Sequence, residues 1–315
     1  MSTVTTPLPT ITQISPTTFH ADVEYLENRW QRIPVGAIDL PLIDLGEGRP
    51  LVFVPILEHL EFVYARQIRA LSQTRRVLLY RRREARTGFV SRSERVEELK
   101  QVLESLNIRS ADFVAHGDAA MVLFEFALRY PEYCRSLVIV AQGADYRIAP
   151  HPFIWLLHEL FLRLPIERLV PASFLRRTVI RYIVSAQPLS AIQPPYSPLT
   201  ELPYALIEEQ FCKITQWAAV YRYSVLPVIH SFDIRTHLAE LKMPILLINR
   251  QDDALSPEKE TAYLARHLPD CADYHVIPAR ERFFLYSQAE TVTPLIESFL
   301  ANHAQDEDVN RAISE

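Results

Sequence analysis

The chain has 315 residues, 49% of them hydrophobic and 23% charged, which is typical of a globular protein with one large domain or a core with a substantial insertion. Its net charge of −5 gives no reason to expect a nucleic-acid partner. Three widely spaced cysteines predict free thiols, and neither a secretory signal nor an apolar run of about 20 residues is seen, so we expect a cytoplasmic protein with no transmembrane segment.

Short apolar runs alternate with amphipathic segments along most of the chain. Residues 1–20 are rich in Thr and Pro without apolar periodicity, and we expect a disordered lead there. Strands are expected over residues 38–45, 51–54, 77–80, 113–115, 137–140, 245–249 and 274–277. Helices are expected over residues 91–106, 119–130, 257–268 and 289–303. This alternation predicts an α/β fold, in which residues 21–145 and 236–303 form a mostly parallel central sheet flanked by helices.

Residues 146–235 interrupt the alternation. Their pattern is helical and apolar over residues 153–164, 174–184 and 204–222, with a Pro-rich loop at residues 193–198. A helical insertion between two strands predicts a cap over the carboxyl ends of the strands, where open α/β sheets bind ligands. Residues 304–315 are acidic and polar, and we expect a flexible tail there.

One segment closely resembles the nucleophile-elbow region of α/β-hydrolases. Residues 113–131 read FVAHGDAAMVLFEFALRYP and are followed by RSLVIV at residues 135–140, where that superfamily has a strand, G-H-S-x-G-G, a helix, R-Y-P-E and a strand. The likeness continues in LGEGRPLVFV at residues 45–54, FDIR at 232–235, MPILLI at 243–248 and SFL at 298–300. The chain is therefore identified as similar to the lipase, esterase and epoxide-hydrolase branches, and the resemblance implies the α/β-hydrolase fold with a helical cap.

The resemblance also implies that the catalytic triad is degenerate. It puts Gly117 at the nucleophile, because Ala115 and Ala119 supply the small residues that the sharp elbow needs on either side. The superfamily's P-G-A-G-H-F motif reads PARERF at residues 278–283, which puts Arg282 at the histidine, and a guanidinium cannot act as a general base. The acid position is kept as Asp253, but an acid without a histidine to orient has lost its catalytic role.

The loops around the expected site also depart from the family's pattern. Residues 55–56, Pro-Ile, replace the His-Gly that helps to build the oxyanion hole, and proline has no N–H to donate. The loop that usually reads D-x-R-G-x-G-x-S is RRREART at residues 81–87. The chain has only 6 glycines, where average usage predicts roughly 22, and they are missing where backbone must approach a substrate closely.

Two residues of the elbow offer an alternative chemistry. A shift of one residue would make Asp118 an aspartate nucleophile like that of epoxide hydrolases. The shift would place His116 where a small residue is needed, and Arg282 would still leave no base. Otherwise Asp118 is a carboxylate favoured by a helix N-terminus, and His116 is structural.

Arginines and cap aromatics are the candidate ligand-binding residues: Arg81, Arg82, Arg83, Arg282, Trp155 and Trp217. In one interpretation Arg282 pairs with Asp253, and ion pairs plug the site. In the other, the surplus arginines bind an anionic group such as a carboxylate or a phosphate. The two tryptophans either belong to the core between cap and sheet or line a pocket for an apolar ligand.

Two functions stay open after these observations. The first is a pseudoenzyme that has lost serine-hydrolase activity and binds an apolar or anionic small molecule, or a protein partner through its cap. The second is an active hydrolase, lyase or isomerase with a non-standard site around Asp118 and His116. We expect neither a cofactor nor a metal in either case.

Overall fold

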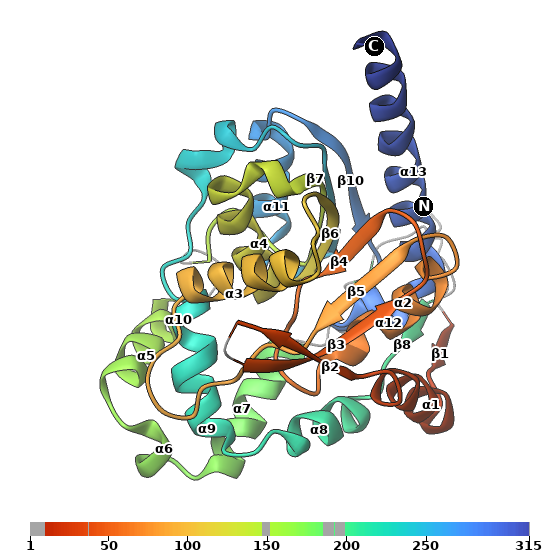
Figure 1. Cartoon of the computed structure of the whole chain (residues 1–315). Coiled ribbons are helices and arrows are strands. Elements are labelled where there is room, and N and C mark those ends of the chain that lie inside the picture. The colour runs from red at the N-terminus through yellow and green to blue at the C-terminus, as the bar shows by residue number, and fades with distance from the viewer. Residues whose placement is uncertain (1–9, 37, 147–151, 185–191, 193–198, 315) are drawn as a thin grey trace, which may run out of the picture.

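The computed structural model describes residues 10–36, 38–146, 152–184, 192 and 199–314. At its centre lies an eight-stranded sheet in the order β10-β9-β7-β6-β4-β5-β3-β2 (Figure 1). The strands are β2 (Gln31–Val35), β3 (Ile38–Leu45), β4 (Pro50–Phe53), β5 (Arg76–Tyr80), β6 (Ala111–His116), β7 (Cys134–Val140), β9 (Ile245–Arg250) and β10 (Cys271–Ile277). The β2–β3 and β3–β5 pairs are antiparallel and the remaining pairs are parallel, which confirms the predicted α/β class.

The central strands are apolar because helices cover the sheet. All six residues of β6 and all six of β9 are buried, as is typical of parallel strands between two helical layers. The flanking helices are α2 (Ala65–Leu71), α3 (Arg92–Ser105), α4 (Asp118–Arg129), α11 (Glu258–His267) and α13 (Ala289–Ser314). Helix α3 packs on α4, and α2 packs on α13. Helix α3 begins at the predicted position, because Ser91 and Glu94 form a reciprocal cap.

Both ends of the chain contain more regular structure than expected. The disordered lead expected over residues 1–20 is wrong for residues 10–20, where β1 (Ile11–Gln13) and α1 (Pro16–Glu27) begin; residues 1–9 lie outside the described part. Ser15 caps α1 by accepting a hydrogen bond from the Thr18 amide, and Phe19 is fully buried. Helix α13 continues through residues 304–314, which contain neither glycine nor proline, and a flexible tail there stays a prediction.

The described residues between β7 and β9 are mostly helical. They form α5 (Pro152–Arg163), α6 (Ile166–Leu169), α7 (Ala172–Val184), α8 (Tyr204–Lys213), α9 (Trp217–Val220), a π-helical turn (Tyr221–Val225) and α10 (Leu226–Ile229). Helices α5 to α9 lie together at the lower left and bottom of Figure 1, as expected of a cap. The single helix expected over residues 204–222 is interrupted near Gln216, whose φ is 52°. The loop expected over residues 193–198 lies outside the described residues.

Shorter elements complete the description. Strand β8 (Leu199–Glu201) pairs with β1 in parallel, and α12 (Phe284–Ser287) precedes α13. Short 3-10 turns cover Glu61–Tyr64, Pro131–Tyr133 and Arg235–Glu240. None of the helices in the described ranges combines the length and the apolarity needed to cross a membrane.

Candidate functional site

A sharp turn joins the central strand β6 to helix α4. Strand β6 ends at His116, α4 begins at Asp118, and Gly117 lies between them with φ 60° and ψ −124°. Residues other than glycine adopt this backbone region only with strain, typically about 1–3 kcal/mol. Ala115 and Ala119 are fully buried on either side, so strand and helix meet closely. This is the geometry of a nucleophile elbow with no side chain at its tip.

Arg282 lies directly beside this tip. A Cβ atom placed on Gly117 would be 3.7 Å from Nη2 of Arg282 and 4.0 Å from its Nε. A side chain at Gly117 would therefore touch the guanidinium. The fold brings together the two positions that the resemblance assigns to nucleophile and histidine.

Asp253 holds the Arg282 guanidinium in place. Nη1 of Arg282 lies 2.6 Å from Oδ1 of Asp253, and its Nη2 donates to the carbonyl oxygen of Ala141. Nε of Arg250 donates to Oδ2 of Asp253 at 2.9 Å, and the Leu255 amide donates to Oδ1 at 2.8 Å. Burial alone would raise the pKa of Asp253, but Arg282 and Arg250 hold it below its usual range. The carboxylate is therefore ionised and fully engaged by neighbouring groups.

The side chain of His116 is hydrogen-bonded to the polypeptide backbone. Its Nε2 lies 2.9 Å from the backbone carbonyl oxygen of Arg282, to which it donates, and its amide donates to the Tyr64 hydroxyl at 3.0 Å. Burial, and next the charge of Arg282, lower the pKa of His116 to about 4. The imidazole is therefore neutral at physiological pH, with Nε2 bonded to the chain segment that carries Arg282.

Asp118 is the first residue of α4 and pairs with a buried arginine. Nη1 of Arg82 donates to its Oδ2 at 3.0 Å, and Nε of Arg82 donates to Glu84 at 2.7 Å. The side chains of Arg82 and Glu84 are almost completely buried, whereas 22% of the Asp118 side chain is exposed. Asp118 is thus an ion-pair partner at a helix N-terminus that also borders the cavity described next.

A cavity of about 100 Å³ lies between the elbow and the cap. Its surface is mostly apolar. Among the described residues, the core contributes Ile56, Leu57, Leu60, His116, Gly117, Asp118, Met121, Gln142, Leu255, Arg282 and Phe283, and the cap contributes Tyr146, Tyr182, Ile183, Trp217, Tyr221, Val225 and Ile229. Three of these residues also carry a buried polar atom without a hydrogen-bond partner in the described part of the chain: Nε1 of Trp217, Oε1 of Gln142 and the hydroxyl oxygen of Tyr182.

Comparisons with known proteins identify the architecture. No family model matches the sequence. The chain is 28% identical over 233 residues to RutD of Azorhizobium caulinodans, provisionally named a carbamate hydrolase, covering 71% of this chain and 81% of that protein. It is 26% identical over 211 residues to the protein of the same name from Serratia proteamaculans, covering 65% of this chain and 73% of that protein.

Solved structures agree on the arrangement of elements. A thermophilic esterase from Thermogutta terrifontis matches with a TM-score of 0.69 at 18% identity, covering 87% of this chain and 98% of that one. The enol-lactonase from Burkholderia xenovorans LB400 matches with 0.68 at 18% identity, covering 86% and 100%. An alpha/beta hydrolase enzyme from a Medee basin deep-sea metagenome matches with 0.64 at 18% identity, covering 86% and 97%. The chain has the α/β-hydrolase fold.

Within this α/β-hydrolase fold, only two of the six candidate ligand-binding residues line the cavity, Arg282 and Trp217. Arg81 lies elsewhere, where it pairs with Glu61 at 2.6 Å and covers the ring of Trp30. Arg82 reaches the cavity only through its partner Asp118.

The other two candidates point to the outside of the molecule. Arg83 has 63% of its side chain exposed, and Trp155 is 37% exposed and stacks on His230. Sequence reasoning missed the tyrosines of the cavity, Tyr146, Tyr182 and Tyr221. Aromatic residues on a helical insertion pack into a core as readily as they line a cavity, so no sequence signal singles them out.

Proposed function

We propose that this α/β-hydrolase-fold protein is a pseudoenzyme, which has lost serine-triad hydrolysis and binds a small, mostly apolar molecule beneath its cap. The observation that most strongly supports this proposal is the position of Arg282. Asp253 and Ala141 fix its guanidinium beside Gly117, the residue without a side chain at the tip of the elbow. Gly117 has no side chain that could act as a nucleophile. The permanently charged guanidinium of Arg282 cannot accept a proton as a general base. Neutral His116 is a poor substitute for the missing base: its Nε2 donates to a backbone carbonyl oxygen, and burial and the charge of Arg282 lower its pKa to about 4, so Nδ1 binds a proton weakly.

The cavity limits the chemistry of the ligand. Apolar cavities of about 150 Å³ hold a molecule such as benzene, so about 100 Å³ suits a compact group of similar or smaller size. Leu57, Leu60 and Met121 favour an apolar body. Arg282 at the cavity wall favours a ligand whose polar end accepts hydrogen bonds or carries a negative charge.

The name of the relatives raises the hypothesis of carbamate hydrolysis. For this chain we do not propose carbamate hydrolysis by a serine triad, because Gly117 and Arg282 stand at two of its three positions. A second candidate function remains an enzyme with a non-standard site, which is favoured by the position of Asp118 on the cavity wall. In that case the Asp118 carboxylate would have to act in spite of its pairing with Arg82.

Trp217 offers a direct readout of binding. Trp30 and Trp155 are the only other tryptophans, so a Trp30→Phe/Trp155→Phe variant leaves Trp217 as the sole indole fluorophore. We expect isobutyrate, isobutanol and isobutylamine, which are no larger than benzene, to change its fluorescence in decreasing order, since Arg282 favours the anion and disfavours the cation. At tenfold excess over the dissociation constant, isobutyrate should stabilise the fold by about 1.4 kcal/mol.

The matched control fills the cavity from the cap side. Val225→Phe adds volume to a residue of the cavity wall, and it should abolish the fluorescence response while the variant still unfolds cooperatively. If none of the three compounds changes either the fluorescence or the melting temperature, the binding proposal is wrong. An equal response in Val225→Phe would place the binding outside the cavity.

A further inference from the structure

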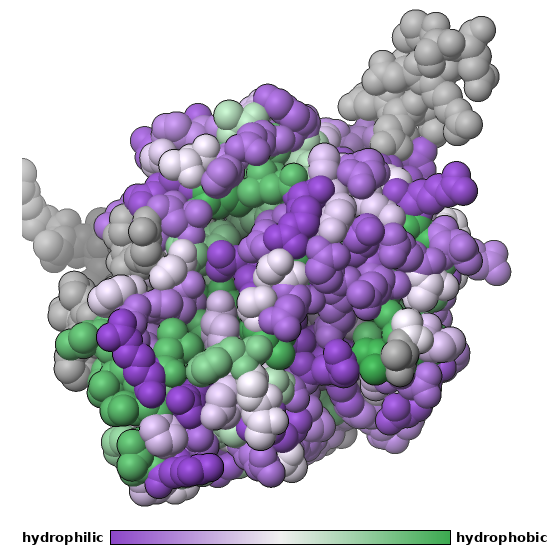
Figure 2. Space-filling model, turned by 60° about the vertical axis from the view of Figure 1, so that its left-hand side comes forward, coloured by the Kyte–Doolittle hydropathy of each residue, from purple (hydrophilic) through white to green (hydrophobic). Residues whose placement is uncertain are grey.

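The outer surface of the cap is unusually apolar. Seven large hydrophobic side chains are exposed among the described residues, and six of them belong to the continuous segment from α5 to α7. They are Trp155, Leu156, Leu160, Leu164, Leu169 and Phe174, of which Leu156, Leu169 and Phe174 are 59%, 63% and 65% exposed. Figure 2 shows apolar side chains gathered beside hydrophilic ones at the lower left of one face. Concentrated exposed apolar surface of this kind marks a binding surface.

One side of helix α5 packs inside the cap and the other side is exposed. Its inner side includes His158, which is buried and lies 3.0 Å from the Tyr221 hydroxyl. Its outer side presents Leu156 and Leu160, one helical turn apart, and Leu164 follows one turn later. Packing within the cap therefore uses the inner side and leaves the outer leucines without a partner in the described structure.

The same segment is basic in an acidic protein. Residues 152–184 contain five arginines and two glutamates, a net charge of +3, whereas the whole chain carries −5. Both glutamates are engaged by cap side chains: Glu159 lies 2.7 Å from His230, and Glu167 lies 3.1 Å from Arg222. The field at this surface is therefore dominated by the arginines.

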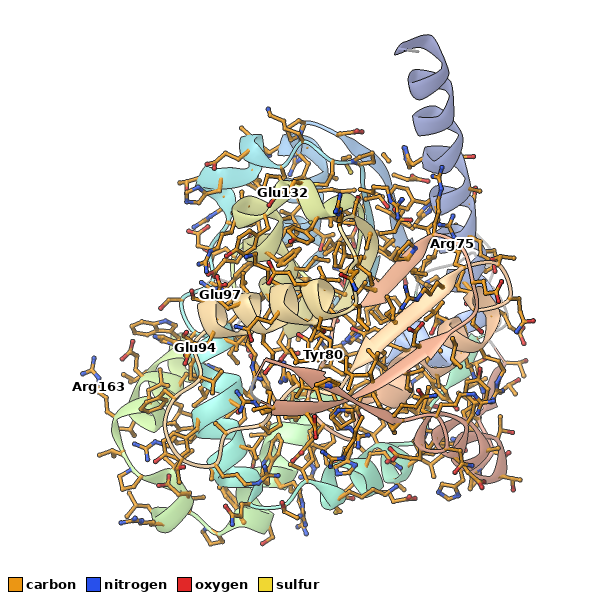
Figure 3. All side chains as sticks on the ribbon, in the orientation of Figure 1. Arg75, Tyr80, Glu94, Glu97, Glu132 and Arg163 are labelled. Carbon is orange, nitrogen blue, oxygen red and sulfur yellow. The ribbon has the colours of Figure 1, made fainter. Side chains whose placement is uncertain are left out.

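The arginines are oriented for contact with a partner. Arg168 and Arg177 are exposed, and neither forms an ion pair with an acidic side chain in the described ranges. The Arg163 side chain pairs with Glu159 at 3.0 Å, but it is 79% exposed and projects outward from the cap in Figure 3. Arg163 and Arg168 directly precede the exposed Leu164 and Leu169 in the chain, so cationic groups lie close to exposed leucines.

We propose that the α5–α7 segment docks on the surface of an anionic lipid bilayer. Leucine, tryptophan and phenylalanine side chains enter the interface between headgroups and acyl chains, while arginines bind the anionic headgroups. The combination favours a bilayer over a nucleic acid, which would use the charges but leave the leucines in water. This docking goes beyond the proposed ligand binding and does not depend on it. Helix α7 nevertheless carries both the exposed Phe174 and Tyr182 of the cavity wall.

Co-sedimentation of the full chain with vesicles tests the proposal. We expect the protein to sediment with vesicles of phosphatidylcholine and phosphatidylglycerol, more weakly at high salt, and to stay in solution with phosphatidylcholine alone. Arg168→Glu/Arg177→Glu should lower the partition coefficient by about thirtyfold or more. Leu156→Ser/Leu160→Ser should also release the protein from the vesicles. Both variants remove only exposed side chains, so their melting temperatures should match that of the wild type.

The control is Arg83→Glu, which changes an exposed arginine that follows β5 and lies outside the α5–α7 segment. This variant should leave vesicle binding unchanged. A wild-type protein that stays in solution with both vesicle types would overturn the proposal. If size-exclusion chromatography then showed a dimer that Leu156→Ser/Leu160→Ser dissociates, a second copy of the chain would be the partner instead. Equal loss of binding in Arg83→Glu would also overturn it, because the α5–α7 segment would have no special role.

Discussion

Asp253→Asn is expected to lower the free energy of unfolding by about 3–5 kcal/mol. The substitution keeps the shape of the side chain but removes the negative charge that Arg282 and Arg250 share at 2.6 and 2.9 Å. Arg282 would then remain in a buried site with no carboxylate partner in the described structure, and this is the costly part of breaking a buried ion pair. Urea unfolding at neutral pH measures the loss.

Asp252→Asn is the matched control for this prediction. Asp252 is the preceding residue, is exposed, and has a positive φ of 47° that asparagine tolerates well. We expect its effect to lie within about 0.5 kcal/mol. Because the folded pKa of Asp253 is depressed, its stabilising contribution is present above the ordinary carboxyl pKa and is lost as the pH falls through the folded value. The difference between Asp253→Asn and the wild type should therefore shrink in acid; a constant difference would contradict the ion-pair explanation.

We expect Glu281→Gln to raise the free energy of unfolding at alkaline pH. This effect should exceed the effect of the same substitution in acid by about 3 kcal/mol. Glu281 is 1% exposed, and neither carboxyl oxygen has a hydrogen-bond partner in the described structure. Burial raises its pKa from 4.5 to about 7. Between these values the folded protein keeps a proton that the unfolded chain has lost, so wild-type stability falls as the pH rises. Glutamine removes the titrating group, and unfolding measured on both sides of this pH range reports the difference.

Glu290→Gln serves as the control, because Glu290 is exposed in the first turn of α13. We expect its effect on the unfolding free energy to lie within about 0.5 kcal/mol. If Glu281→Gln and the wild type lost stability in parallel between pH 4.5 and 7, the Glu281 carboxyl would titrate in its ordinary range and would not be effectively buried. The result bears on the candidate site, because Glu281 directly precedes Arg282 in the chain.

The sequence predicts the sheet well because its central strands are buried on both faces. A continuous apolar run such as residues 245–249 has no better interpretation in an alternating α/β pattern, and β9 covers it. The edges of the molecule are less predictable. The sequence signals for helix α1 are one capping serine and a few apolar residues. Because the residues before them are rich in Thr and Pro, the sequence predicts a disordered lead instead of a helix.

The site is predictable where the backbone alone determines the position. Gly117 sits at the end of β6, and Arg282 and Asp253 follow β10 and β9, so the fold brings all three to the same edge of the sheet. The candidate arginines were less predictable, because their roles depend on where long side chains point. Directly after β5, Arg81 pairs with Glu61 and Arg82 pairs with Glu84. No spacing in the sequence predicts either pairing.

Turnover by the purified wild-type protein and by Asp118→Asn tests the loss of hydrolase activity most directly. The substrates are esters, thioesters, epoxides and carbamates, with an active esterase assayed beside them as the positive control. We expect no turnover above background by either protein, because Gly117 offers no nucleophile and the Arg282 guanidinium occupies the place of the base. Turnover by the wild type that disappears in Asp118→Asn would show that Asp118 is the nucleophile, and would contradict the proposal of a pseudoenzyme.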